Sequence, residues 1–254
     1  YEHMQVIPGI NYQALFHNPA NKQLLEVSLD TLVQHVSGYD VSKPKDIIKT
    51  AKYFTLTGST PQSEYDKLIA ELRDYLLIPT LAIDIETKSE NPDIEKAALR
   101  FNTNSITSIA FAKNEHEGIA IYFDNESKVK EILKHWFLQR AEICKSNTSF
   151  KNVYHNCLYD VKQLIFHLFM NNPADIPNLL YGIKVMTTNI DDTLLMTYLC
   201  TNNTQENTLG LKENALSFTG QYAVDVKDIS LLPIDVLLEY NLKDVLATYW
   251  LYNK

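Results

Sequence analysis

The chain has 254 residues, of which 45% are hydrophobic and 21% charged, which is typical of a globular protein and excludes an extensively disordered one. Its formal net charge of −8 argues against a large basic surface for duplex DNA, but not against a small site where cations supply positive charge. We expect no membrane span and no signal peptide, and the three isolated cysteines predict reduced thiols in the cytoplasm or another reducing compartment.

Hydrophobic periodicity predicts two regions of different character. Residues 1–51 are an N-terminal extension of unknown role with one expected helix at 22–36, and 52–254 form an α/β domain with a mixed sheet. The expected strands cover 52–57, 80–86, 105–113, 118–124 and 151–156. The expected helices cover 63–76, 126–140, 157–170, 191–200, 209–220 and 233–254.

The tripeptide Asp-Ile-Glu occurs twice, at 84–86 and at 93–95, in different surroundings. Asp84 and Glu86 end an apolar strand, where residues two apart point to the same face and two carboxylates can converge on one cation. Asp93 and Glu95 follow Asn91-Pro92 in a polar stretch and fit the first turn of a helix, where acids are favoured. We therefore predict a metal site at the first pair only.

Two further segments carry acids at positions that suit a shared site. Asp160 falls in the first turn of the helix that follows the strand at 151–156. Tyr240 and Asp244 are four residues apart, and so on one face of the last helix. An aspartate among valine, leucine and tryptophan is costly to bury unless it is paired, which favours a functional role for Asp244.

In combination, the segments "DIET" at 84–87, "HNCLYD" at 155–160 and "YNLKD" at 240–244 resemble the three motifs of the DEDD superfamily of 3′→5′ exonucleases, in its tyrosine-bearing subgroup. The nearer resemblance is to the proofreading domain of family A (polymerase I-like) DNA polymerases. It covers residues 52–254, including "DDTLLMTYL" and "TLGLKENAL".

This resemblance implies a ribonuclease H-like fold, with a five-stranded mixed sheet flanked by helices. It implies that two divalent ions, Mg²⁺ or Mn²⁺, are bound by four catalytic carboxylates: Asp84, Glu86, Asp160 and Asp244. Tyr240 would hydrogen-bond and orient the attacking water, because a phenol with an ordinary pKa is a poor full base.

Three neighbours of the motifs are expected to contact substrate, each with a structural alternative. Thr87 would touch the terminal nucleotide or simply end its strand. Asn156 would bond the substrate or cap a helix, and Tyr159 would stack on a base or pack in the core. For Asp192 we expect the capping of a helix N-terminus.

The implied activity is hydrolysis of the terminal phosphodiester at the 3′ end of single-stranded or frayed DNA, as in the proofreading domain of a replicative polymerase. The partners would be that DNA end and a polymerase domain in the same full-length chain. Two alternatives stay open: a ribonuclease D-like enzyme that trims RNA 3′ ends, and a catalytically inactive module that binds DNA.

Overall fold

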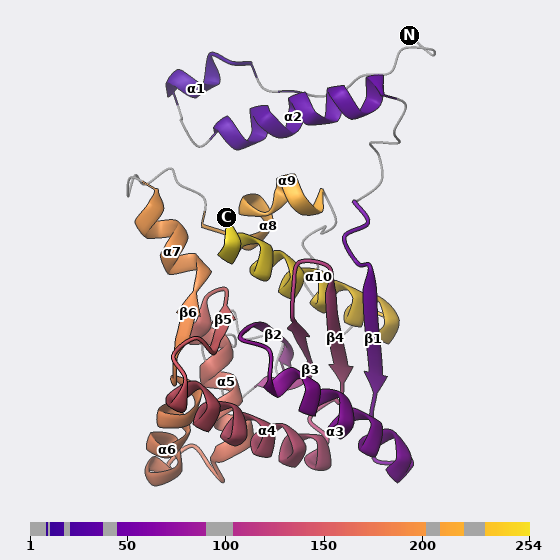
Figure 1. The fold of residues 1–254 in the computed structure, drawn as a ribbon, viewed down its shortest axis with the longest axis vertical. Helices are drawn as coiled ribbons and strands as arrows, with labels where there is room; N and C mark the ends of the chain where they lie inside the picture. The colour runs from indigo at the N-terminus through magenta and orange to yellow at the C-terminus, as the bar shows by residue number, and fades with distance from the viewer. Residues whose placement is uncertain are drawn as a thin grey trace.

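The computed structural model describes residues 9, 11–17, 21–37, 45–89, 104–201, 209–220 and 232–254. The described residues contain a mixed sheet with the strand order β1-β4-β3-β2-β5-β6 (Figure 1). The strands are β1 Thr50–Thr55, β2 Thr80–Ser89, β3 Asn104–Ala112, β4 Glu117–Tyr122, β5 Lys151–Tyr154 and β6 Ile190–Asp192. The strand β3 is antiparallel to β2 and β4, and the other neighbouring pairs are parallel.

Helices connect and cover these strands. They are α1 Ala14–His17, α2 Asn21–Val36, α3 Gln62–Leu76, α4 Ser127–Ser146, α5 Cys157–Phe169, α6 Ile176–Met186, α7 Thr193–Cys200, α8 Leu211–Asn214, α9 Leu216–Thr219 and α10 Ile234–Asn253. The predicted α/β class and mixed sheet are confirmed. The sheet has six strands rather than the expected five, because the short strand β6 precedes α7.

The alternation of side chains along β2 divides the interior into two cores. Leu81, Ile83 and Ile85 are buried in the larger core, which the sheet forms with α3, α4 and α5. In that core the Phe111 ring meets the edge of the Trp136 ring at a centroid distance of 5.0 Å. Because the residues between these apolar positions point the other way, Asp84 and Glu86 face the side of the sheet that α10 covers.

The helix α10 lies close against its side of the sheet because small residues face it. Ala82, Ala110 and Ala120 are fully buried in the second core with leucines and valines of α10. A Cβ atom added to Gly118 would lie 2.8 Å from Leu242 Cδ1, so the approach requires glycine there. In Figure 1, α10 lies apart from the pair α3 and α4, with the strands between them.

The chain before β1 and the pair α8–α9 are tied to each other and to α10. Lys45 donates from Nζ to the Ser217 carbonyl at 2.8 Å, and its backbone N–H donates to the Thr219 carbonyl at 3.2 Å. The rings of Phe218 and Trp250 stack at 5.2 Å with an interplanar angle of 4°. These contacts hold α9 against the C-terminal part of α10 and against the chain before β1.

The sequence predicts no membrane span and three reduced cysteines. Among the described residues, no helix has both the length and the apolar character needed to cross a bilayer. All three cysteines are described, and each is a free thiol: Cys144, Cys157 and Cys200.

Candidate active site

The first two acids lie in the middle of β2, which continues to Ser89 beyond the expected strand end at Glu86, and the sheet changes register directly after them. Glu86 pairs with Ser108 of β3, but the next residue, Thr87, pairs with Ile106. The Thr107 hydroxyl donates to the Glu86 carbonyl at 2.9 Å across this irregularity. Bulges of this kind re-aim side chains beside functional sites, and here the bulge follows the acidic pair directly.

Three carboxylates from distant parts of the chain meet beside this part of β2. One oxygen each from Asp84, Glu86 and Asp244 lies within 4.8 Å of the other two. Asp84 and Glu86 come from β2 and are partly exposed, whereas Asp244 comes from α10 and is 7% exposed. The cluster therefore has a closed side against the helix and a side open to ions and substrate.

Burial and mutual repulsion make this cluster unfavourable without a counter-charge. The pKa of Asp84 is raised well above its ordinary value, first by burial and then by Asp160, Glu86 and Asp244. Burial, followed by the charge of Asp244, raises the pKa of Glu86 to about 8. Because Mg²⁺ and Mn²⁺ prefer oxygen ligands and would neutralise these charges, the donor set fits a divalent cation.

The fourth predicted acid lies beside the close group of three rather than within it. Asp160 is in the first turn of α5 and is 4% exposed. Its pKa is raised by burial and then by the charges of Glu86 and Asp192, and its own charge acts on Asp84. The structure thus brings all four predicted carboxylates into one electrostatic neighbourhood.

The start of α5, and with it Asp160, is held by a carboxylate from another element. The Asp192 side chain accepts from the backbone N–H groups of Asn156 and Cys157 at 3.0 and 2.9 Å, and from that of Leu194 at 2.9 Å. The predicted capping role of Asp192 is confirmed, and it extends to a second helix. Asn156 occupies the N-cap position of α5, which is one of its two expected roles, in a left-handed conformation (φ 64°) and without a side-chain hydrogen bond to the helix.

Tyr240 stands one turn before Asp244 on α10, as the spacing predicts. Its hydroxyl oxygen accepts a hydrogen bond from Lys212 Nζ of α8 at 2.6 Å. Burial, followed by the charges of Asp244, Glu86 and Asp84, raises its pKa above the ordinary value of 10.0. Tyr240 is therefore a neutral phenol at physiological pH.

Asn241, next to Tyr240, is a site residue that sequence reasoning missed. Its Nδ2 donates to Asp84 Oδ2 at 2.6 Å, and its Oδ1 accepts from the Ser108 hydroxyl at 3.1 Å. The Asn241 side chain is fully buried, so the hydrogen bonds from Ser108 to Asn241 and from Asn241 to Asp84 fix the position of one carboxylate oxygen of Asp84. The signal available in the sequence was its place inside the "YNLKD" segment, which alone did not specify a partner.

Two of the residues that are predicted to contact substrate are hydrogen-bonded to each other. The hydroxyls of Thr87 and Tyr159 lie 2.5 Å apart, and Asn104 Nδ2 is 3.5 Å from the Tyr159 hydroxyl. Tyr159 is half-buried, and the third predicted contact, Asn156, is exposed. The substrate roles of all three stay predictions.

The second Asp-Ile-Glu copy lies outside the described residues. Its expected place in the first turn of a helix, with Asp93 and Glu95 away from the metal site, therefore stays a prediction.

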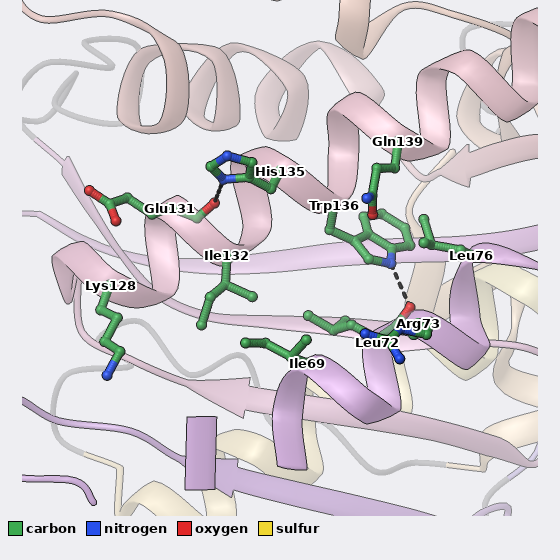
Figure 2. A pocket seen from close by; sticks show the side chains of 10 residues that line it. All are labelled: Ile69, Leu72, Arg73, Leu76, Lys128, Glu131, Ile132, His135, Trp136 and Gln139. Carbon is green, nitrogen blue, oxygen red and sulfur yellow. Dashed lines mark hydrogen bonds between the residues drawn. The ribbon is translucent and has the colours of Figure 1, made fainter. Parts of the chain in front are cut away.

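A hollow of about 400 Å³ lies on the other side of the sheet, between α3 and α4 (Figure 2). Its lining includes Ile69 and Leu72 of α3 and Ile132 and Trp136 of α4. These helices pack on the side of β2 opposite to the acids, so the hollow is separate from the carboxylate cluster.

No protein-family model matches the sequence, and no curated protein matches it. Solved structures of nucleases do resemble it. The RNase D of Trypanosoma brucei is 14% identical, with a TM-score of 0.52 over 82% of this chain and 65% of that one. Brucella melitensis NrnC with bound Mg²⁺ is 16% identical, with a TM-score of 0.46 over 80% and 79%. The EXO domain of Aedes aegypti Nibbler is 11% identical, with a TM-score of 0.49 over 83% and 89%.

At such low identity, the likeness to the RNase D establishes a common fold. That fold is the ribonuclease H-like arrangement that the sequence resemblance implies. The superfamily and the narrower resemblance to the proofreading domain of family A polymerases stay predictions from the sequence motifs.

Proposed function

We propose that the protein is a metal-dependent 3′→5′ exonuclease that removes nucleotides from the end of single-stranded RNA. The observation that carries this proposal is the meeting of Asp84, Glu86 and Asp244, with oxygen atoms within 4.8 Å of one another, beside a central strand. An acid cluster that is costly alone and suited to divalent cations is what phosphodiester hydrolysis requires.

The proposed roles of the residues follow from their places in the site. Asp84, Glu86 and Asp244 would hold divalent cations, with Asp160 completing the acidic wall from α5. When bound, such cations supply Lewis-acid stabilisation of the anionic phosphodiester and activation of water. Asn241 would keep the Asp84 carboxylate oriented towards the open side.

Tyr240 would help to position the attacking water beside the carboxylates, and its raised pKa keeps the proton on the phenol, so that it would not act as the base. The terminal nucleotide would be contacted by Thr87, Asn156 and Tyr159. Of these three residues, Asn156 is the exposed one. A substrate consisting of one strand end needs few basic side chains, which reconciles the site with a net charge of −8.

The choice of RNA over DNA rests on the fold likeness to an RNase D, which supports the ribonuclease alternative raised by the motifs. A DNA-proofreading domain joined to a polymerase domain is the second candidate. It stays a prediction that rests on the sequence resemblance alone. An inactive DNA-binding module is disfavoured, because all four acids and the tyrosine are present and the acids cluster.

The test compares 5′-labelled single-stranded RNA and DNA of the same sequence, with Mg²⁺ or Mn²⁺ and with EDTA. We expect a ladder that shortens from the 3′ end, faster on RNA, and no cleavage in EDTA. Release of nucleoside 5′-monophosphates would be read by chromatography. Faster cleavage of DNA than of RNA would favour the DNA-proofreading function. If neither RNA nor DNA is degraded with Mg²⁺ or with Mn²⁺, the proposed function is contradicted.

A further inference from the structure

Lys212 reaches the acidic site from an element that the three motifs do not include. It lies on α8, which the stacking of Phe218 on Trp250 and contacts between α8 and α10 hold against the last helix. Its Nζ atom is 2.6 Å from the Tyr240 hydroxyl oxygen and 4.9 Å from the centre of the Tyr240 ring. The sequence alone favours a solvated helix face for Lys212, with a contribution to holding the substrate phosphate as the alternative.

The chemistry of the two groups gives this contact a direction. An ammonium group has three N–H donors and no acceptor, so the hydrogen bond runs from Lys212 to the tyrosine oxygen. A phenol has a single proton, and that proton must then point elsewhere. The hydroxyl also shares a hydrogen bond with Asp244, one turn further along α10. Lys212 therefore sets which way the Tyr240 O–H bond points.

We propose that Lys212 is a positioning residue that acts through Tyr240, holding its hydroxyl so that the O–H is directed into the carboxylate cluster. This inference rests on the proposed function, since the group to be positioned there is the attacking water. A direct contact between Lys212 and a substrate phosphate is the rival role.

A double-mutant cycle separates the two roles. The variants are Lys212→Met, Lys212→Arg, Tyr240→Phe and the double variant with methionine at 212 and phenylalanine at 240. Lys243→Met is the matched control, because Lys243 is a lysine of α10 that forms an ion pair with Glu239 at 2.6 Å. The readouts are kcat and KM on single-stranded RNA with Mn²⁺, and their dependence on salt.

We expect Lys212→Met to lower kcat roughly 10- to 100-fold, as misplacement of a reacting group does, with KM within about twofold of wild type. Lys212→Arg should restore part of the rate, and Lys243→Met should leave it unchanged. In the Tyr240→Phe background, Lys212→Met should have no further effect. If the losses in kcat of the two single variants multiply in the double variant, the inference is overturned in favour of phosphate binding. The same holds if Lys212→Met raises KM and alters its salt dependence.

A structural readout keeps the inference testable apart from activity. In crystals of Lys212→Met soaked with Mn²⁺, we expect the Tyr240 hydroxyl to move away from its place beside Asp244 while the carboxylates stay. An unmoved hydroxyl, or a Lys212→Met enzyme with full kcat, would overturn the inference and leave the proposed function standing. A wild-type protein that cleaves neither RNA nor DNA would instead overturn the proposed function.

Discussion

Single residues of β2 are subject to opposing requirements of stability and function. Glu86 shares a 4.8 Å neighbourhood with two other carboxylates, so in the absence of metal its charge destabilises the folded state. We expect Glu86→Gln to abolish exonuclease activity and to raise the melting temperature in EDTA, because an amide removes one of the repelling charges. Calorimetry and the RNA assay measure the two effects.

Asp93→Asn is the control for this substitution, since Asp93 belongs to the second Asp-Ile-Glu copy. It should leave both activity and melting temperature unchanged. An inactive Asp93→Asn variant together with an active Glu86→Gln variant would reverse the assignment of the two Asp-Ile-Glu copies. A lowered melting temperature for Glu86→Gln would contradict the repulsion between the carboxylates.

Asn241 donates a hydrogen bond to Asp84, so the loss of its side chain should weaken metal binding. Groups that orient a metal ligand typically contribute about 10- to 100-fold to affinity, so we expect Asn241→Ala to weaken Mn²⁺ binding by about this factor. Ser108→Ala removes only the support of Asn241 and should have a smaller effect. Isothermal titration calorimetry tests both, and unchanged affinity in Asn241→Ala would contradict the role.

The sequence predicted those site residues whose positions follow from local periodicity. Asp84 and Glu86 share a face because strand side chains alternate, and Tyr240 and Asp244 share one because they are a helical turn apart. The hydrogen bond from Asn241 to Asp84 joins residues 157 positions apart, and that from Lys212 to Tyr240 joins residues 28 apart. Such bonds depend on how close α10 and α8 come to their neighbours, which periodicity does not report.

At the scale of elements, the distance between α10 and the sheet decides whether Asp244 reaches the acids of β2. A Cβ atom on Gly118 would lie 2.5 Å from the Phe111 carbonyl oxygen and 2.8 Å from Leu242 Cδ1. We expect Gly118→Ala to lower the free energy of unfolding by about 1–3 kcal/mol through overpacking, and to lower activity as α10 shifts. Denaturant unfolding of the metal-free protein measures the first effect.

Gly58→Ala is the matched control, because a Cβ atom there would meet nothing within 4 Å. It should change the stability by less than about 0.5 kcal/mol. Equal effects at the two glycines would contradict a close approach of α10.

Most expected elements are present, and the differences have physical reasons. The strand β6 has three residues, too few for an alternating pattern, and its last residue, Asp192, doubles as the cap of α7. The expected helix at 209–220 is two short helices separated at Ala215. The helix α6 went unpredicted although Pro177 lies in its first turn, because exposed apolar residues such as Leu180 obscure its amphipathic pattern.

For the whole molecule, the acid cluster couples stability to pH and metal. In the metal-free protein the pKa of Glu86 is raised from 4.5 to about 8, and burial also raises those of Asp84 and Asp160. The folded state therefore keeps protons that the unfolded chain has released. Stability from these groups is greatest at low pH and is lost as pH rises through the folded pKa values.

We accordingly expect the melting temperature in EDTA to fall between about pH 6.5 and 8.5, and the increase caused by Mn²⁺ to grow over the same interval. The window avoids His167, whose pKa is lowered from 6.5 to about 4 by burial and then by Lys130, so that its opposite contribution is constant above pH 6.5. Differential scanning fluorimetry measures both trends. A melting temperature that rises with pH in EDTA would contradict the coupling, and Glu86→Gln should flatten the slope.

The central claim is that Asp84, Glu86 and Asp244, far apart in the chain, jointly bind divalent cations. Anomalous diffraction from a crystal soaked in Mn²⁺ tests it most directly. We expect a strong peak within coordination distance of oxygen atoms from all three side chains. A well-ordered site with no anomalous peak among these carboxylates would contradict the account.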